Sequence, residues 1–187
     1  MARSRRSTAP GAAPLSPKRK WRAILLATLL LAPAYWSLLA GLVSVASENP
    51  TGAPAPGPYI AFGLGLVPFV FVVLAFLSEH PNAPMAVVKA MTLTLLIGIP
   101  ISALAADAVT GFVAGVGAGG IAALRADLGH RWKARALAIV VVALWTFVTV
   151  RSVSVVALLL APALPFTSLG VADHLSELRR ERASSAV

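Results

Sequence analysis

Residues 107–124 read DAVTGFVAGVGAGGIAAL, and this glycine-rich stretch decides what kind of fold the chain can adopt. Gly111, Gly115 and Gly119 recur every four residues, a spacing that places them within about 80° of one helix face. Five glycines fall between residues 111 and 120. In a water-exposed helix each would cost roughly 1 kcal/mol relative to Ala. The stretch is best explained as a transmembrane helix against which another helix packs closely.

The composition of the whole chain agrees with a membrane location. The 187 residues are 58% hydrophobic, and their mean hydropathy of +0.82 is far above that of a soluble domain. Several apolar runs are long enough to cross a hydrocarbon core of about 30 Å. The sequence therefore predicts an all-α integral membrane protein and excludes a soluble globular fold.

The charge pattern predicts how the apolar runs are arranged. Cytoplasmic loops of membrane proteins are enriched in Lys and Arg. Residues 21–46 and 58–78 form two apolar runs, joined by a turn-rich loop that holds Glu48 and no basic residue. We expect this loop to lie outside and the two runs to form a first hairpin.

The remaining apolar runs, residues 85–124 and 136–172, are each about twice as long as one span. The first has Lys89 one turn from its start, a basic segment (residues 125–135) separates the two runs, and a basic tail follows the second, so both runs are expected to start and end in the cytoplasm. A run that starts and ends in the cytoplasm crosses the membrane an even number of times. Each run therefore predicts a hairpin, with Asp107 and Arg151 near the outer turns. The expected fold is an integral membrane helical bundle of six transmembrane helices in three hairpins.

The third hairpin has an alternative. Residues 151–154 read RSVS and contain none of the residues that favour tight turns. One long helix over about residues 133–160 would then replace the hairpin, which leaves five transmembrane helices and an external C-terminal tail. The six-helix arrangement agrees better with the distribution of basic residues.

This topology divides the chain into three parts. Residues 1–20 are basic and rich in Pro, Ser and Ala, which predicts a disordered tail. Residues 21–172 form the transmembrane helical domain, and residues 173–187 form a second basic tail. Both termini are expected in the cytoplasm. Twelve Arg against four Lys, in a chain rich in Ala, Val and Leu, suggest a GC-rich bacterial genome and hence the bacterial cytoplasmic (inner) membrane.

The excess of positive charge indicates which kinds of partner the chain can bind. The chain has 16 Lys and Arg against 7 Asp and Glu, concentrated at the ends of the apolar runs. These ends predict contact with anionic lipid headgroups. Nucleic-acid binding is not expected, because single-stranded nucleic acids stack on aromatic side chains and the N-terminal tail has none before Trp21.

Two kinds of polar residue are candidates for a functional site. Asp107 and Arg151 interrupt otherwise uncharged runs, and either they lie among headgroups at their turns or they pair and bind a charged substrate. His80, His130 and His174 each have a carboxylate close in sequence. If the three converge they form a metal-binding or proton-binding cluster, and otherwise they are solvated histidines at the interface.

No catalytic motif is present: the chain lacks HExxH, GxSxG, a P-loop and any cysteine. We therefore expect no enzyme activity, cofactor or metal. The leading hypothesis is a non-enzymatic accessory or scaffold subunit that packs against a membrane-protein partner or a second copy of itself. The alternative is a small oligomeric transporter or channel, and an intramembrane enzyme comes third. A transporter would use the helix-kinking prolines, which are Pro33, Pro68, Pro100 and Pro162.

The glycine face itself has two interpretations. Gly111, Gly115 and Gly119 either pack tightly inside the bundle or between protomers, or belong to a helix that lines a pore. The residues between them are apolar apart from Thr110, which favours packing. Gly115→Leu should push the neighbouring helix away, and we expect Val116→Leu, about 100° further round the helix, to be tolerated better.

Overall fold

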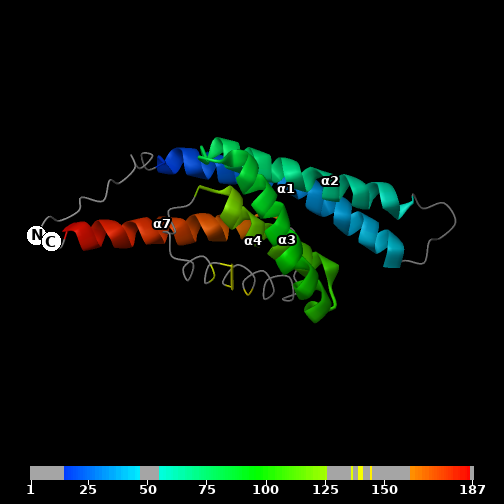
Figure 1. The fold of residues 1–187 in the computed structure, drawn as a ribbon. Coiled ribbons are helices and arrows are strands. Elements are labelled where there is room, and N and C mark those ends of the chain that lie inside the picture. Colours follow the sequence, from blue (N-terminus) through cyan, green and yellow to red (C-terminus); the bar gives the residue numbers. More distant parts are fainter. Residues whose placement is uncertain are drawn as a thin grey trace, which may run out of the picture.

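The structure is a computed structural model that describes residues 15–46, 55–125 and 161–185, together with residues 136, 139, 140 and 144. The five helices in this part of the chain are α1 (Pro17–Ala46), α2 (Pro56–Leu77), α3 (Ala83–Ala105), α4 (Ala108–Ala123) and α7 (Leu164–Ser185) (Figure 1). All regular structure described is α-helical, so the predicted all-α class is confirmed. Helices α1, α2 and α3 are long and apolar enough to cross a membrane.

The prediction of six transmembrane helices requires three more spans than these three helices provide. Helix α4 is apolar but has 16 residues, about 24 Å, which is shorter than a hydrocarbon core. Most of the run 136–160, which separates the six-helix from the five-helix arrangement, lies outside the described residues.

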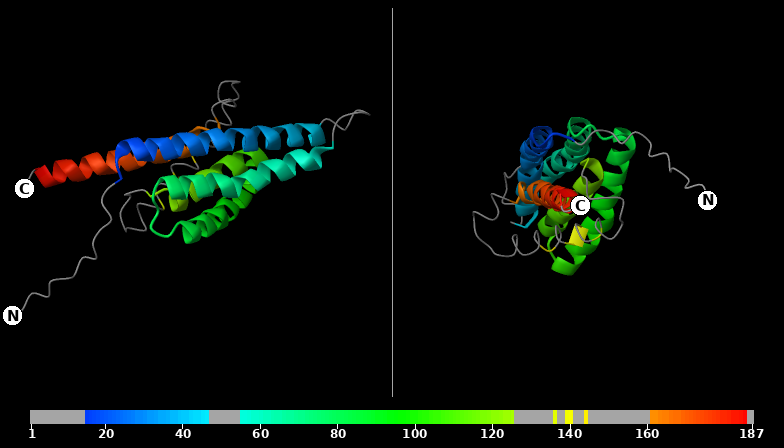
Figure 2. Two further views of the ribbon diagram at one scale, coloured as in Figure 1. Left: turned by 90° about the horizontal axis from the view of Figure 1, so that it is seen from above. Right: turned by 90° about the vertical axis from the view of Figure 1, so that its left-hand side faces the viewer.

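Helices α1 and α2 form an antiparallel pair. Gly63 of α2 lies against Ala34 and Leu38 of α1, and Gly41, further along α1, lies against Ile60, which comes earlier in α2. A Cβ atom at Gly63 would stand 2.7 Å from the carbonyl oxygen of Ala34. At each of these two glycines, the backbone of one helix is in contact with atoms of the other. The two helices run side by side in Figures 1 and 2.

Helices α3 and α4 form a second antiparallel pair, and the glycine face joins them. Gly111 lies against Gly98 and Ser102, Gly115 against Gly98 and Thr94, and Gly119 against Thr94 and Ala90. A Cβ atom at Gly119 would stand 2.6 Å from the carbonyl oxygen of Ala90, and one at Gly98 would stand 2.9 Å from that of Gly111. The two backbones are thus in direct contact over three helical turns.

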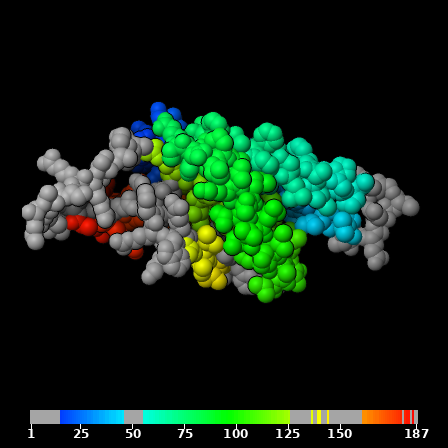
Figure 3. All heavy atoms as spheres, in the orientation of Figure 1, coloured from blue at the N-terminus to red at the C-terminus, as the bar shows by residue number. Residues whose placement is uncertain are grey.

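Helix α4 is enclosed by other helices, since it also packs against α2 and α7. In the space-filling view α3 forms much of the front face (Figure 3). Val116 is fully buried in the core that includes Phe71 of α2 and Phe166 of α7. Val116 therefore lies against other side chains, and the expectation that Val116→Leu is tolerated better than Gly115→Leu stays a prediction.

Two helix boundaries differ from those expected. Helix α1 begins at Pro17 rather than Trp21, with proline in the first turn, where the missing N–H is harmless. Helix α7 continues without a break across position 172, where the basic tail was expected to begin. Residues 17–20 and 173–185 are therefore helical extensions, and the contacts between them are described below.

The α3–α4 contact predicts different effects for the same substitution at two glycines. A methyl group at Gly115 would overlap the carbonyl oxygen of Thr94, whereas one at Gly65 of α2 would meet no atom within 4 Å. We expect Gly115→Ala to lower the free energy of unfolding in detergent by about 1–3 kcal/mol. Gly65→Ala should leave that free energy unchanged or slightly raised. Equal losses in the two variants would contradict the packing role of the glycine face.

Candidate functional site

Charged side chains gather where α1 begins and where α2 and α4 end. Three contacts between helices lie at this end: Lys20 of α1 with α7, Arg19 of α1 with Glu79 after α2, and Arg125 after α4 with Ser78. We call it the charged end. Every described Lys and Arg lies at this end or on α7, whereas Asp107 lies at the opposite end.

The strongest of these contacts is a buried ionic cluster. The Nζ atom of Lys20 donates hydrogen bonds to the carboxylate of Asp173 and to Oε1 of Glu177, the latter at 2.7 Å. Lys20 is 4% exposed, Asp173 is fully buried and Glu177 is 22% exposed. Asp173 and Glu177 are four residues apart and so share one face of α7. A single ammonium group therefore joins α1 to two successive turns of α7.

The other two contacts hold the ends of α2 and α4. Arg19 and Glu79 form an ion pair between exposed side chains, and such pairs add little stability. The backbone N–H of Arg125 donates to Oγ of buried Ser78 at 3.0 Å. This bond holds the backbone of Arg125, two residues beyond the end of α4, against the end of α2.

Helix α7 has a packed half and a projecting half. Phe166 and Leu169 are fully buried, and a Cβ atom at Gly170 would stand 3.1 Å from the ring of Trp21 on α1. Beyond Asp173 most positions are exposed, and Leu175 is 50% exposed. The C-terminal half of α7 extends beyond the start of α1 (Figure 2). Helix α7 is thus anchored at one end and presented to its surroundings at the other.

At the opposite end of the bundle, Asp107 is the N-cap of α4. Its carboxylate accepts hydrogen bonds from the backbone N–H of Val109 at 3.0 Å and of Thr110 at 3.1 Å, and also from the Thr110 hydroxyl. Ala106, in a left-handed conformation with φ of 49°, makes the turn from α3. The local role of Asp107 is therefore to begin α4. Arg151, the other half of the predicted pair, lies outside the described residues.

The predicted histidine cluster is not visible in the described part of the chain. The backbone N–H of Asn82 donates to Nδ1 of His80 at 3.2 Å, in the α2–α3 loop. Nδ1 of His174 lies 3.9 Å from Glu177 on α7. Among the described residues no group of three or more His, Asp or Glu is arranged to hold a metal ion. His130 lies outside those residues.

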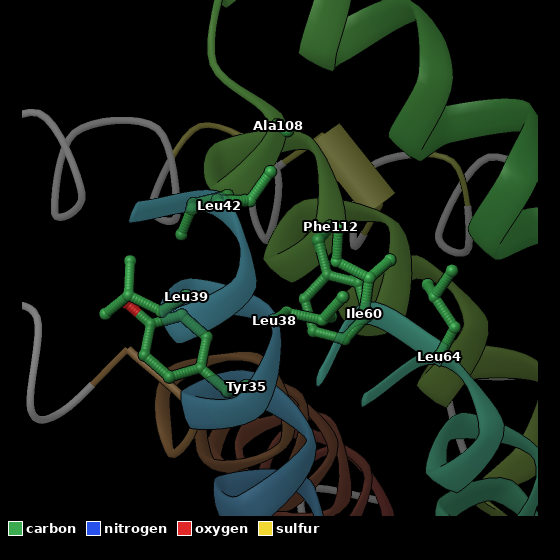
Figure 4. A pocket seen from close by; sticks show the side chains of 9 residues that line it. Tyr35, Leu38, Leu39, Leu42, Ile60, Leu64, Ala108 and Phe112 are labelled. Atoms are coloured by element: carbon green, nitrogen blue, oxygen red, sulfur yellow. The ribbon is translucent and has the colours of Figure 1, made fainter. Parts of the chain in front are cut away.

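An apolar cavity of about 190 Å³ lies between α1, α2 and α4, near the end that holds Asp107. Tyr35, Leu38, Ile60 and Phe112 are among its lining residues, and among the described residues that line it only Tyr35 brings a polar side-chain group, its hydroxyl (Figure 4). That hydroxyl is buried and has no hydrogen-bond partner within the described part of the chain. A cavity with this lining suits an apolar group and offers few ligands to an ion.

Sequence reasoning missed the ionic cluster. The sequence places Lys20 in a tail expected to be disordered and Asp173 at the start of a second basic tail. The available signal was the spacing in DHLSE, residues 173–177, where two carboxylates lie on one helix face close to a membrane-spanning run. Their partner 153 residues earlier is not indicated by any local pattern.

Substitutions at Asp107 separate a capping role from a role for the charge. Asp107→Ala removes the N-cap and should lower the free energy of unfolding in detergent by about 0.5–2 kcal/mol. Asp107→Asn keeps an acceptor oxygen and should retain most of that stability. If Asp107→Asn is as unstable as Asp107→Ala, then the negative charge itself is required and the cap does not explain the residue.

The buried cluster predicts a strong effect at Lys20 and a weak one nearby. Lys20→Met removes the ammonium group that bonds to the buried Asp173 carboxylate and should cost about 3–5 kcal/mol of unfolding free energy. Adding Asp173→Asn to Lys20→Met should recover part of the loss, because the buried charge is then gone. Lys18→Met, at an exposed position of the same turn, is the matched control and should change little. A loss as large in Lys18→Met would show that charge at this end, and not the cluster, sets stability.

Comparison with known proteins gives no relative: no protein-family model matches the chain, and no curated protein or solved structure is significantly similar to it. What the chain does must therefore be inferred from its own residues and contacts.

Proposed function

We propose that this chain is a multi-pass membrane protein that acts as a non-enzymatic accessory or scaffold subunit, and that the projecting half of α7 is its docking element. The observation that carries this proposal is the division of α7 into a buried, ion-paired half and an exposed half. A helix held in this way is available to a partner without being needed to close the core.

The anchoring of α7 supports a docking role on energetic grounds. Binding by a mobile segment loses free energy to the ordering of its backbone and side chains. Here Gly170 packs against α1, and Lys20 bonds to Asp173 and Glu177, so the helix is already ordered where it leaves the bundle. A partner that binds the projecting half meets a preformed surface.

The exposed surface of α7 indicates what such a partner offers. Val171, Leu175, Arg179 and Arg182 are exposed and follow one another at intervals of three or four residues, which places them along one face. The face is apolar near the bundle and basic towards the C-terminus. Its chemical complement is a groove with an apolar floor and acidic residues at its outer end.

The distribution of basic residues supports an orientation. The charged end carries exposed Lys18, Arg19 and Arg22 at the start of α1, and the C-terminal half of α7 extends from the same end. Under the positive-inside rule this end faces the cytoplasm. We therefore place the docking face of α7 on the cytoplasmic side of a bacterial inner membrane.

The test is purification of the full chain, tagged at its N-terminus, from native membranes. We expect a stoichiometric partner with the unmodified chain and about tenfold less of it with Leu175→Ala plus Arg179→Ala, because truncated contact residues each cost about 1 kcal/mol or more. The matched control is Leu25→Ala plus Lys18→Ala, which removes an exposed leucine and an exposed cation from α1. The control should retain the partner.

Two results would contradict the proposal. Equal loss of the partner in both double variants would show that α7 is not the docking element. A chain that purifies only as a homo-oligomer, and that carries ions or solutes across liposome membranes, would instead support the transporter or channel alternative.

A further inference from the structure

A second cavity, about 310 Å³ in volume, lies at the charged end between the α2–α3 loop, the start of α3 and the end of α4. It differs from the cavity beside Tyr35 in being partly polar. Lys89 of α3, Arg125 after α4 and His80 of the loop all line it, together with Asn82 and apolar side chains that include Met85 and Ile121.

The charges around this cavity favour an anion. Lys89 of α3 and Arg125 after α4 both line the cavity, and its described lining residues include neither Asp nor Glu. Glu79, next to His80 in the sequence, is paired with Arg19 on α1. A guanidinium and an ammonium group in one cavity are the usual partners of a phosphate group, to which Arg donates two parallel hydrogen bonds.

The position of Lys89 suggests the depth of the site. Lys89 is the seventh residue of α3, so its Cα lies about 9 Å along the helix from the first residue. Its stem can follow the apolar helix surface while the ammonium group reaches the level of the headgroups. The cavity therefore combines cationic groups with the boundary region of a candidate transmembrane helix.

The cavity is also continuous with an exposed apolar surface of α3. Met85 lines it and is 49% exposed, and Val88 follows one turn later, 60% exposed. Leu95 and Ile99 continue the same face of α3 and are exposed as well. A phosphate bound at Lys89 and Arg125 would thus lie at the head of an apolar strip, which a free phosphate ion does not need.

We propose that this cavity binds the phosphate headgroup of an anionic phospholipid, whose acyl chain lies along the exposed face of α3. Lys89 and Arg125 bind the phosphate, while Met85 and Val88 contact the start of the chain. None of the lining residues named for this cavity belongs to α7. The cavity can therefore bind a lipid whether or not a protein partner is bound to α7.

Native mass spectrometry of the full chain in detergent tests this site, with phosphatidylglycerol and phosphatidylcholine added separately. We expect phosphatidylglycerol to be retained in preference to phosphatidylcholine. In Lys89→Gln plus Arg125→Gln, retention of phosphatidylglycerol should fall about tenfold or more, since hydrogen bonds to charged groups contribute about 1.5–3 kcal/mol each. The control, Lys18→Gln plus Arg22→Gln, removes two exposed cations from the same end and should retain the lipid.

Three outcomes would overturn the proposal: equal loss of lipid in the two double variants, equal retention of the two lipids by the unmodified chain, and protection of the chain against thermal unfolding by inorganic phosphate as strong as that by phosphatidylglycerol. The last outcome would assign the cavity to a free anion. If the double variant does not fold, Lys89→Gln alone is compared with Lys18→Gln by the protection that phosphatidylglycerol gives against thermal unfolding.

Discussion

Direct contact between the backbones of α3 and α4 is the constraint on which the rest of this structure depends. In lipid, apolar side chains gain nothing by leaving water, so helices associate through close packing. Gly111, Gly115 and Gly119 permit that packing because no side chain separates them from Gly98 and Thr94. Since α4 is also short, it is suited to a position enclosed by longer helices, where protein rather than lipid covers its ends.

The position of α4 determines what happens at both ends of the bundle. At its start Asp107 satisfies the first N–H groups, so the chain turns out of α3 within two residues. At its other end the Arg125 N–H bonds to Ser78, and the Phe166 ring of α7 fills the space above Gly120. Because α7 rests on α4 in this way, Asp173 comes to lie beside Lys20 of α1.

Hydropathy and glycine spacing predicted the helical class because a backbone in lipid must form its hydrogen bonds within a helix. The same argument located the turn near Asp107, since a charge there interrupts two apolar stretches. It did not predict the ionic cluster. Lys20 and Asp173 read locally as parts of two solvated tails, and only the packing of α7 on α1, through Gly170, brings them together. Nor did it show that Val116 is buried, because an enclosed helix has no distinct outer face.

The buried cluster is better understood as a device for positioning α7 than as a source of stability. Moving an ammonium and a carboxylate out of water costs several kcal/mol per ion, which their attraction offsets only in good geometry. The apolar contacts of α7, through Phe166 and Gly170, depend on shape and do not by themselves exclude a displacement of about 5.4 Å, one helical turn. Such a displacement would break the hydrogen bonds from Lys20 to Asp173 and Glu177, and it is therefore disfavoured. Lys20 accordingly selects one register of α7, and with it the face that the projecting half presents.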